Sequence, residues 1–146
     1  EAVSGARPLR GAAPDALPEP DAWLAAAAHH DELFAPLDRG VRIALVARSA
    51  PARMLVWEAG DAGVDARIEP FAGYAASAAD IVLAADDESL SDVRSAAAGR
   101  LFEVLRAGIR SGHVVCYMLK RRCVLEERGL DELLDALGFA FMGACR

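Results

Sequence analysis

Short apolar runs alternate with amphipathic segments along this chain. Each apolar run has the length of a strand and is bounded by glycine, proline or charged residues. Several of the intervening segments repeat their apolar residues every three or four positions, as a helix with one buried face does. The pattern predicts five strands, at Val41–Ala47, Val64–Glu69, Ile81–Ala85, His113–Leu119 and Phe139–Ala144.

The predicted strands differ in how apolar their two faces are. Val41–Ala47 is apolar on both faces apart from Arg42, which is typical of a central strand with helices on each side of the sheet. In Val64–Glu69 the residues alternate between apolar and charged, which predicts a half-exposed strand at the edge of the sheet.

Four helices are expected before and between these strands. Residues 71–79 are small and predict a short helix or a turn. The expected helices are one from Pro20-Asp21 to Pro36, one that Ser49 caps and that ends near Gly60, one at Ser91–Arg110 and one at Leu130–Leu137.

The alternation of strands and helices predicts an α/β fold. We expect a single doubly wound, mostly parallel five-stranded sheet, flavodoxin-like or Rossmann-like, in the strand order 2-1-3-4-5 and with an extra N-terminal helix. The alternative is an α+β domain in which one of the shorter elements has been misassigned. Proline-rich residues 1–20 are expected to form a flexible leader, and residues 21–146 a single domain.

The composition of the chain limits the kinds of molecule that we expect it to bind. Lysine occurs once, and asparagine, glutamine and threonine are absent, which indicates a bacterial protein from a GC-rich genome. The net charge of -6 argues against nucleic-acid binding, which favours a basic surface. No apolar run reaches the roughly 18 residues of a membrane span. The odd number of cysteines favours a reducing compartment, so we expect a cytoplasmic protein.

The most promising place for a site follows the first predicted strand. In open α/β sheets, ligands bind beyond the carboxyl ends of the strands, where the strand order reverses. Arg48, Ser49 and Arg53 lie there, and a helix that begins at Ser49 would offer free amide groups to a phosphate or carboxylate. Alternatively, Ser49 is only a helix cap and the arginines are solvated, since the glycine-rich signatures of close phosphate binding are missing.

Two further charged groups end other strands. Asp86 and Asp87 follow the third strand, where they suit Mg²⁺ or the first turn of a helix. Lys120 and Arg121 follow the fourth strand, where they would bind an anion together with Arg48 or pair with nearby acids. The predicted ligand-binding residues are therefore Arg48, Ser49, Arg53, Asp86, Asp87, Lys120 and Arg121.

The sequence gives only weak evidence for other kinds of functional site. His29 and His30 are adjacent on a predicted helix and point in different directions, so we predict no metal site. His113 opens a strand and is expected to be structural. No serine lies in a Gly-x-Ser-x-Gly turn, which argues against a serine hydrolase. Cys123 lies beside cations, which favour a reactive thiolate.

Together these features predict a non-catalytic binding or regulatory module that recognises a small anionic ligand or a protein partner. One alternative is a small enzyme that acts on a phosphorylated or nucleotide-like substrate, with Asp86 or Asp87 as the base. A thiol-transfer protein that uses Cys123 is a further alternative. The sequence identifies no cofactor.

Overall fold

Five strands form one mixed sheet. The computed structural model describes residues 17–139 of the chain. Among these strands, β2 and β5 run parallel, and the other neighbouring pairs are antiparallel. The strands, in the spatial order β4-β3-β2-β5-β6, are β4 (Gly63–Pro70), β3 (Arg53–Gly60), β2 (Arg42–Ala47), β5 (Ile81–Ala85) and β6 (Val114–Met118).

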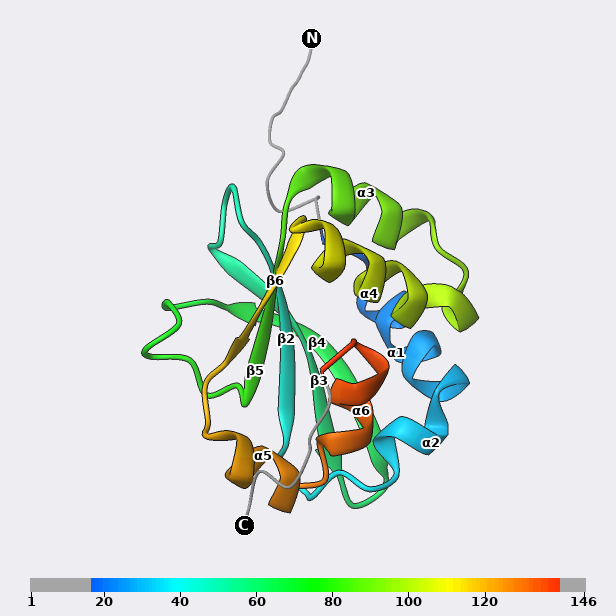
Figure 1. Cartoon of the computed structure of the whole chain (residues 1–146), viewed down its shortest axis with the longest axis vertical. Helices are drawn as coiled ribbons and strands as arrows, with labels where there is room; N and C mark the ends of the chain where they lie inside the picture. Colours follow the sequence, from blue (N-terminus) through cyan, green and yellow to red (C-terminus); the bar gives the residue numbers. More distant parts are fainter. Residues whose placement is uncertain (1–16, 140–146) are drawn as a thin grey trace, which may run out of the picture.

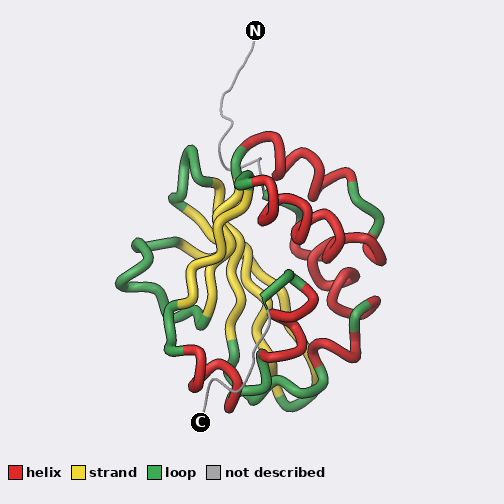
Figure 2. Tube along the Cα trace, viewed as in Figure 1, coloured by secondary structure: helices red, strands yellow, loops and turns green. Residues whose placement is uncertain are grey.

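The helices gather on one face of this sheet. Figures 1 and 2 show α1 to α4 and α6 on one side of the strands, whereas the other side carries loops. We refer to these sides as the helix face and the loop face. The helices are α1 (Pro20–His29), α2 (Asp31–Phe34), α3 (Asp87–Ser95), the 3-10 turn η3 (Ala98–Arg100), α4 (Leu101–Ser111), α5 (Arg122–Glu127) and α6 (Asp131–Ala136).

A strand stands where the sequence predicted the second helix. Residues Arg53–Gly60 form β3, which pairs antiparallel with β2 and with β4. Leu55 and Trp57 belong to the core on the helix face, while Met54 and Val56 belong to the core on the loop face. A strand buried on both faces is a continuous apolar run, and such a short run has no period that distinguishes it from a helix.

The prediction of a doubly wound, mostly parallel sheet is therefore wrong. Because β3 lies between β2 and β4, the flavodoxin-like strand order is also wrong. The structure contains the kind of misassigned element that the α+β alternative allowed for. The edge position predicted for Val64–Glu69 is confirmed, since β4 is the last strand on its side of the sheet.

Some predicted boundaries also change. The helix expected at Ser91–Arg110 is divided into α3 and α4 by residues 96–100. Gly112, with a φ of 87°, ends α4 in the left-handed conformation typical of a glycine after a helix. The predicted strand at Phe139–Ala144 falls outside the described residues apart from Phe139, and so do residues 1–16 of the predicted leader.

An aromatic stack fixes α1 to the helix face of the sheet. The ring of Trp23 lies parallel to that of Trp57, with 3.8 Å between centroids and 9° between planes. The indole N–H of Trp57 donates to the backbone oxygen of Trp23 at 2.7 Å. Phe34 meets Trp57 edge to face at 4.9 Å. These contacts bury large apolar surfaces in favourable ring geometries, which stabilises the docking of α1 and α2.

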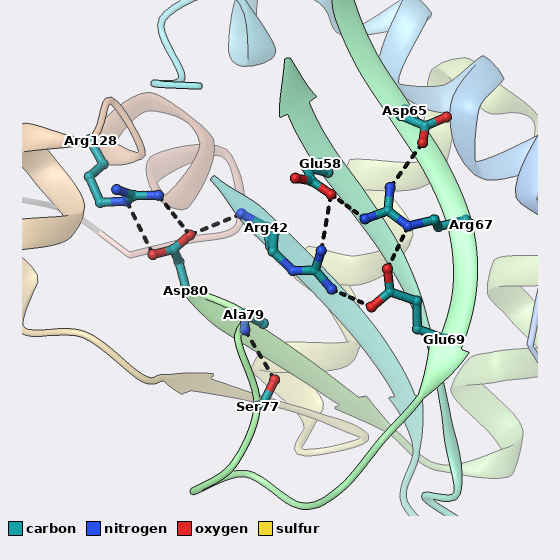
Figure 3. A network of polar contacts seen from close by, with 9 residues as sticks. All are labelled: Arg42, Glu58, Asp65, Arg67, Glu69, Ser77, Ala79, Asp80 and Arg128. Carbon is teal, nitrogen blue, oxygen red and sulfur yellow. Dashed lines mark hydrogen bonds and ion pairs between the residues drawn. The ribbon is translucent and has the colours of Figure 1, made fainter. Parts of the chain in front are cut away.

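The loop face carries charged residues near the β4 edge. Arg42 pairs with Glu58 and Glu69, and Arg67 pairs with Glu58, Glu69 and Asp65 (Figure 3). Burial alone would raise the pKa of Glu69, but hydrogen bonds from Arg42 and Arg67 outweigh it and lower that pKa. The network therefore stays charged at neutral pH and gives the exposed part of this face a polar surface.

Candidate functional site

The parallel pair β2 and β5 brings two of the predicted site segments together. The backbone N–H of Arg48 donates to the oxygen of Ala85 at 2.9 Å, directly before Asp86. Ser49 Oγ donates to Asp87 Oδ1 at 3.0 Å. We call Arg48, Ser49, Asp86, Asp87 and His113 the carboxyl-end cluster, because they surround the carboxyl ends of these two strands.

His113 joins this cluster although the sequence suggested only a structural role. Its backbone oxygen accepts from the N–H of Asp86 at 2.9 Å, which continues the antiparallel pairing of β5 with β6. Its Nδ1 lies 2.5 Å from Asp86 Oδ2. The signal that could have revealed this pair was the antiparallel direction of β6, since antiparallel pairing places the residue before β6 opposite the residue after β5.

The Asp86 carboxylate has two partners that favour its charged form. Its Oδ1 accepts from the N–H of Ser89 at 2.9 Å, which caps α3. This backbone hydrogen bond and the bond to His113 lower the pKa of Asp86. Conversely, the hydrogen bond and the charge of Asp86 raise the pKa of His113. The result is a carboxylate–imidazole pair that holds its proton on the ring to higher pH than a free histidine.

The surroundings of Arg48 differ from those expected. Residues 48–52 form the turn between β2 and β3, so no helix begins at Ser49 and the expected dipole is absent there. The guanidinium of Arg48 donates to the backbone oxygens of Gly112 at 3.1 Å and His113 at 3.3 Å. Arg48 thus helps to hold the end of α4 against the sheet. Binding of an anion by this cluster stays a prediction.

The other predicted site residues lie apart from this cluster or at its margin. Arg53 is exposed at the start of β3, near the carboxyl end of β2. Lys120 and Arg121 follow β6, which runs antiparallel to β5, so they lie at the opposite end of the sheet. Lys120 Nζ there lies 3.5 Å from Asp80 Oδ1, and Arg121 is exposed directly before α5. The expected meeting of Lys120 and Arg48 does not occur.

A groove runs between α3 and α4 and reaches His113. Its volume is about 690 Å³, and residues of both helices line it. Gly108 allows the two helices to approach, because a Cβ there would lie 2.9 Å from Ser89 Oγ and 2.6 Å from Val114 Cγ2. The imidazole of His113, oriented by Asp86, is the group in this groove that is best placed to exchange a proton.

A second, mostly apolar cavity lies beside α1. It has a volume of about 460 Å³, and we call it the α1 pocket. Trp23, which is 1% exposed, is among its lining residues, and its indole Nε1 has no hydrogen-bond partner within residues 17–139. The lining residues are Leu17, Pro18, Glu19, Ala22, Trp23, Ala25, Ala26, Val93, Arg94, Ala96, Ala98 and Leu101.

Metal binding and thiol chemistry find little support among the described residues. Within the described part of the chain, no three His, Cys, Asp or Glu side chains are grouped to hold a metal ion. Burial raises the pKa of Cys116 to about 12, so its thiol is protonated at neutral pH. Cys123 is disulfide-bonded, which removes the thiol that the thiol-transfer alternative requires.

No helix between residues 17 and 139 has the length and apolar character needed to cross a membrane.

Comparison with known proteins gives no relative. No family model matches the chain, and neither the curated proteins nor the solved structures contain a match.

Proposed function

We propose that this protein is a non-catalytic binding module that takes a small, largely apolar ligand into the α1 pocket. The main support is that Trp23, whose buried indole N–H has no partner among the described residues, is one of the residues lining a pocket walled mainly by alanine, leucine and valine. Its size falls within the roughly 300 to 1,000 Å³ of small-molecule sites.

The chemistry of the pocket defines the class of ligand. An apolar body would gain from leaving water, in proportion to the area that it buries. An unpaired donor on a lining residue favours a ligand with one acceptor oxygen, because a buried N–H without a partner is costly. An alcohol, a ketone or a carboxylate with an apolar chain fits both conditions. This class differs from the small anionic ligand or protein partner expected from the sequence, an expectation that relied in part on a helix start at Ser49 that the structure does not contain.

The test uses three ligands that share a ten-carbon chain: decanol, decanoate and decylamine, each below the concentration at which it forms micelles. Fluorescence of the Trp23–Trp57 pair reports binding. Decanol and decanoate offer an acceptor oxygen, whereas the protonated amine offers none. We expect the amine to bind about tenfold more weakly, which corresponds to one buried hydrogen bond.

Three variants locate the site. Trp23→Phe keeps an aromatic ring but removes the N–H, so it should weaken decanol binding more than decylamine binding, with Trp57 as the reporter. Ala25→Phe should abolish binding by filling the pocket. Ala28→Phe, one turn further along α1 and also exposed, is the matched control. No fluorescence change with any ligand, or equal binding by Ala25→Phe and Ala28→Phe, would contradict the proposal.

The Asp86–His113 pair supports a second candidate, a small enzyme that acts on a phosphorylated substrate in the groove between α3 and α4. Oriented by Asp86, His113 would take a proton from an attacking water. Hydrolysis of p-nitrophenyl phosphate that is lost in His113→Asn, and retained in a His29→Asn control, would support this candidate. Activity that survives in His113→Asn would remove it.

A further inference from the structure

The two edge strands of the sheet differ in how they are protected. Exposed strand edges offer unpaired backbone groups, and proteins commonly block them with charges or proline. The β4 edge carries Asp65, Arg67 and Glu69 and ends at Pro70. By contrast, β6 has the sequence Val-Val-Cys-Tyr-Met, without a charge or a proline. Within the part of the chain that the structure describes, the β6 edge therefore lacks the features that discourage pairing.

The backbone of β6 presents three residues to this edge. Leu119 N donates to Asp80 O, and Asp86 N donates to His113 O, each at 2.9 Å, so these residues form hydrogen-bonded pairs across β5 and β6. Such pairs alternate along an antiparallel ladder. Counting inward from both ends, Val114, Cys116 and Met118 turn their N–H and C=O groups away from β5. None of these outward groups bonds to another described residue.

We propose that the β6 edge binds the β6 edge of a second copy of this chain, antiparallel and about a two-fold axis. The register with Cys116 opposite the partner's Cys116 uses every outward group. Val114 then lies opposite the partner's Met118, and the reverse pair follows by symmetry. Three amides from each copy give six hydrogen bonds, which join the two sheets into one.

Side chains on the loop face support the same register. Tyr117 is 40% exposed and is one of the two most exposed large apolar side chains in the described part of the molecule. In the proposed dimer it lies opposite the partner's Val115, on the same face and at the close spacing of a pair without hydrogen bonds. Pairing would therefore cover an apolar surface that the monomer leaves in water.

Charge favours an antiparallel pair over a parallel one. At the start of β6 lie Asp86, Asp87 and Glu88, which outnumber Arg48 there. At its end lie Lys120, which pairs with Asp80, and the exposed Arg121. Antiparallel pairing places the basic end of one copy beside the acidic end of the other. A parallel pair would bring like charges together. This complementarity selects a second copy over an extended peptide of unrelated sequence.

The seam is five residues long, so we expect a weak dimer whose population depends on protein concentration. Sedimentation velocity over a concentration series, at low and at high salt, measures the dimer dissociation constant. Tyr117→Lys places a charge on the seam without removing a buried side chain and should raise this constant about tenfold or more. Asp65→Lys introduces the same side chain on the β4 edge and should leave it unchanged.

Amide hydrogen exchange by NMR tests the register directly. The amides of Val114, Cys116 and Met118 should exchange rapidly in dilute samples and slowly in concentrated ones, whereas the amides of the β4 edge should show no such change. Arg121→Glu should weaken the dimer and remove much of its salt dependence. A protein that stays monomeric up to about 1 mM, or a dimer in which these three amides still exchange rapidly, would overturn the proposal.

Discussion

Asp80 and Asp86 flank β5, one before its first residue and one after its last. Both carboxylates connect β5 to its neighbours, yet their environments differ. The side chain of Asp80 is 2% exposed, whereas that of Asp86 is 34% exposed. Aspartate therefore has different surroundings at the two ends of β5. Asp80 is buried and helps to hold the strands together, whereas the carboxylate of Asp86 stays accessible to solvent.

Asp80 is surrounded by groups that compensate its burial. Its Oδ2 accepts from the backbone N–H of Arg42 at 2.9 Å and from Arg128 Nη2 at 3.4 Å. Its Oδ1 forms an ion pair with Arg128 Nε at 3.1 Å. Lys120 completes the group at 3.5 Å. Asp80 thus joins β2, β5 and the chain after β6 (Figure 3). A buried carboxylate with these partners has little freedom to bind anything else.

The largest expected effect is the loss of Asp80. Asp80→Ala leaves the guanidinium of Arg128 and the N–H of Arg42 without their acceptor, and breaking a buried pair on one side typically costs about 3 to 5 kcal/mol. Urea unfolding followed by circular dichroism measures the free energy of unfolding. Asp87→Ala, at the other end of β5 and exposed, is the control and should unfold close to wild type. An equal loss of unfolding free energy in both variants would show that the two ends of β5 contribute equally to stability.

Close packing at the Asp86 end gives the next largest effect. Gly108→Ala adds a Cβ only 2.6 Å from Val114 Cγ2 and 2.9 Å from Ser89 Oγ. Overpacking of this kind costs roughly 1 to 3 kcal/mol, more than the helix propensity that alanine gains. Thermal unfolding measures the loss. Gly99→Ala, whose Cβ would meet a His29 ring nitrogen at 3.4 Å, is the control and should change the melting temperature little. A Gly108→Ala protein as stable as wild type would show that this end is loosely packed.

The sequence located both ends of β5 but assigned their partners incorrectly. The apolar run Ile81–Ala85 predicts a buried strand without indicating the direction of its neighbours. A parallel β6 predicts Lys120 beside Arg48, whereas the antiparallel β6 places it beside Asp80. His113 was missed for the same reason, because the reversal that moves Lys120 away brings His113 to Asp86.

The incorrect prediction of a helix in place of β3 also arises because the apolar pattern leaves the structure undetermined. Met54 to Trp57 is apolar on every face, and a short run of this kind suits a two-sided strand and a buried helix equally well. The convergence of Arg48, Ser49, Asp86 and Asp87 was nevertheless foreseeable. It depends on β2 and β5 being parallel neighbours, a predicted relation that the structure retains. The predicted neighbours β5 and β6 also lie side by side, but they run antiparallel. The α1 pocket depends on how helices pack and has no signature in the sequence.

The pH dependence of stability should distinguish the two ends further. The raised pKa of His113 contributes stability that is fully present below its ordinary value of 6.5 and is lost as pH rises through the folded-state pKa. The lowered pKa of Asp86 contributes stability that is present above 3.8 and is lost as pH falls through the folded-state pKa. The pair should therefore stabilise the fold most between about pH 4 and pH 6.5.

Melting temperatures of wild type and His113→Asn across this range measure that contribution. Asparagine keeps a donor near the position of Nδ1 but cannot be protonated. The difference between the two proteins should be largest near pH 5.5 and should shrink above neutrality. His29→Asn is the control and should parallel wild type. A difference that stays constant with pH would show that His113 acts through shape alone.

The smallest expected effect concerns the proton on His113 itself. Asp86→Asn keeps an oxygen to cap the N–H of Ser89, so α3 should stay intact, but the negative charge beside the imidazole is lost. The pKa of His113 should then fall toward its ordinary value, while the nearby Glu88 still raises it and Arg48 still lowers it. NMR titration of the ring protons measures this shift with little change in stability. The pKa of His113 could instead stay as high in Asp86→Asn as in wild type. That result would show that the whole acidic loop after β5, and not the Asp86 carboxylate alone, raises the pKa of His113. The difference between the two ends of β5 would then lie in the surrounding segments and not in Asp80 and Asp86 themselves.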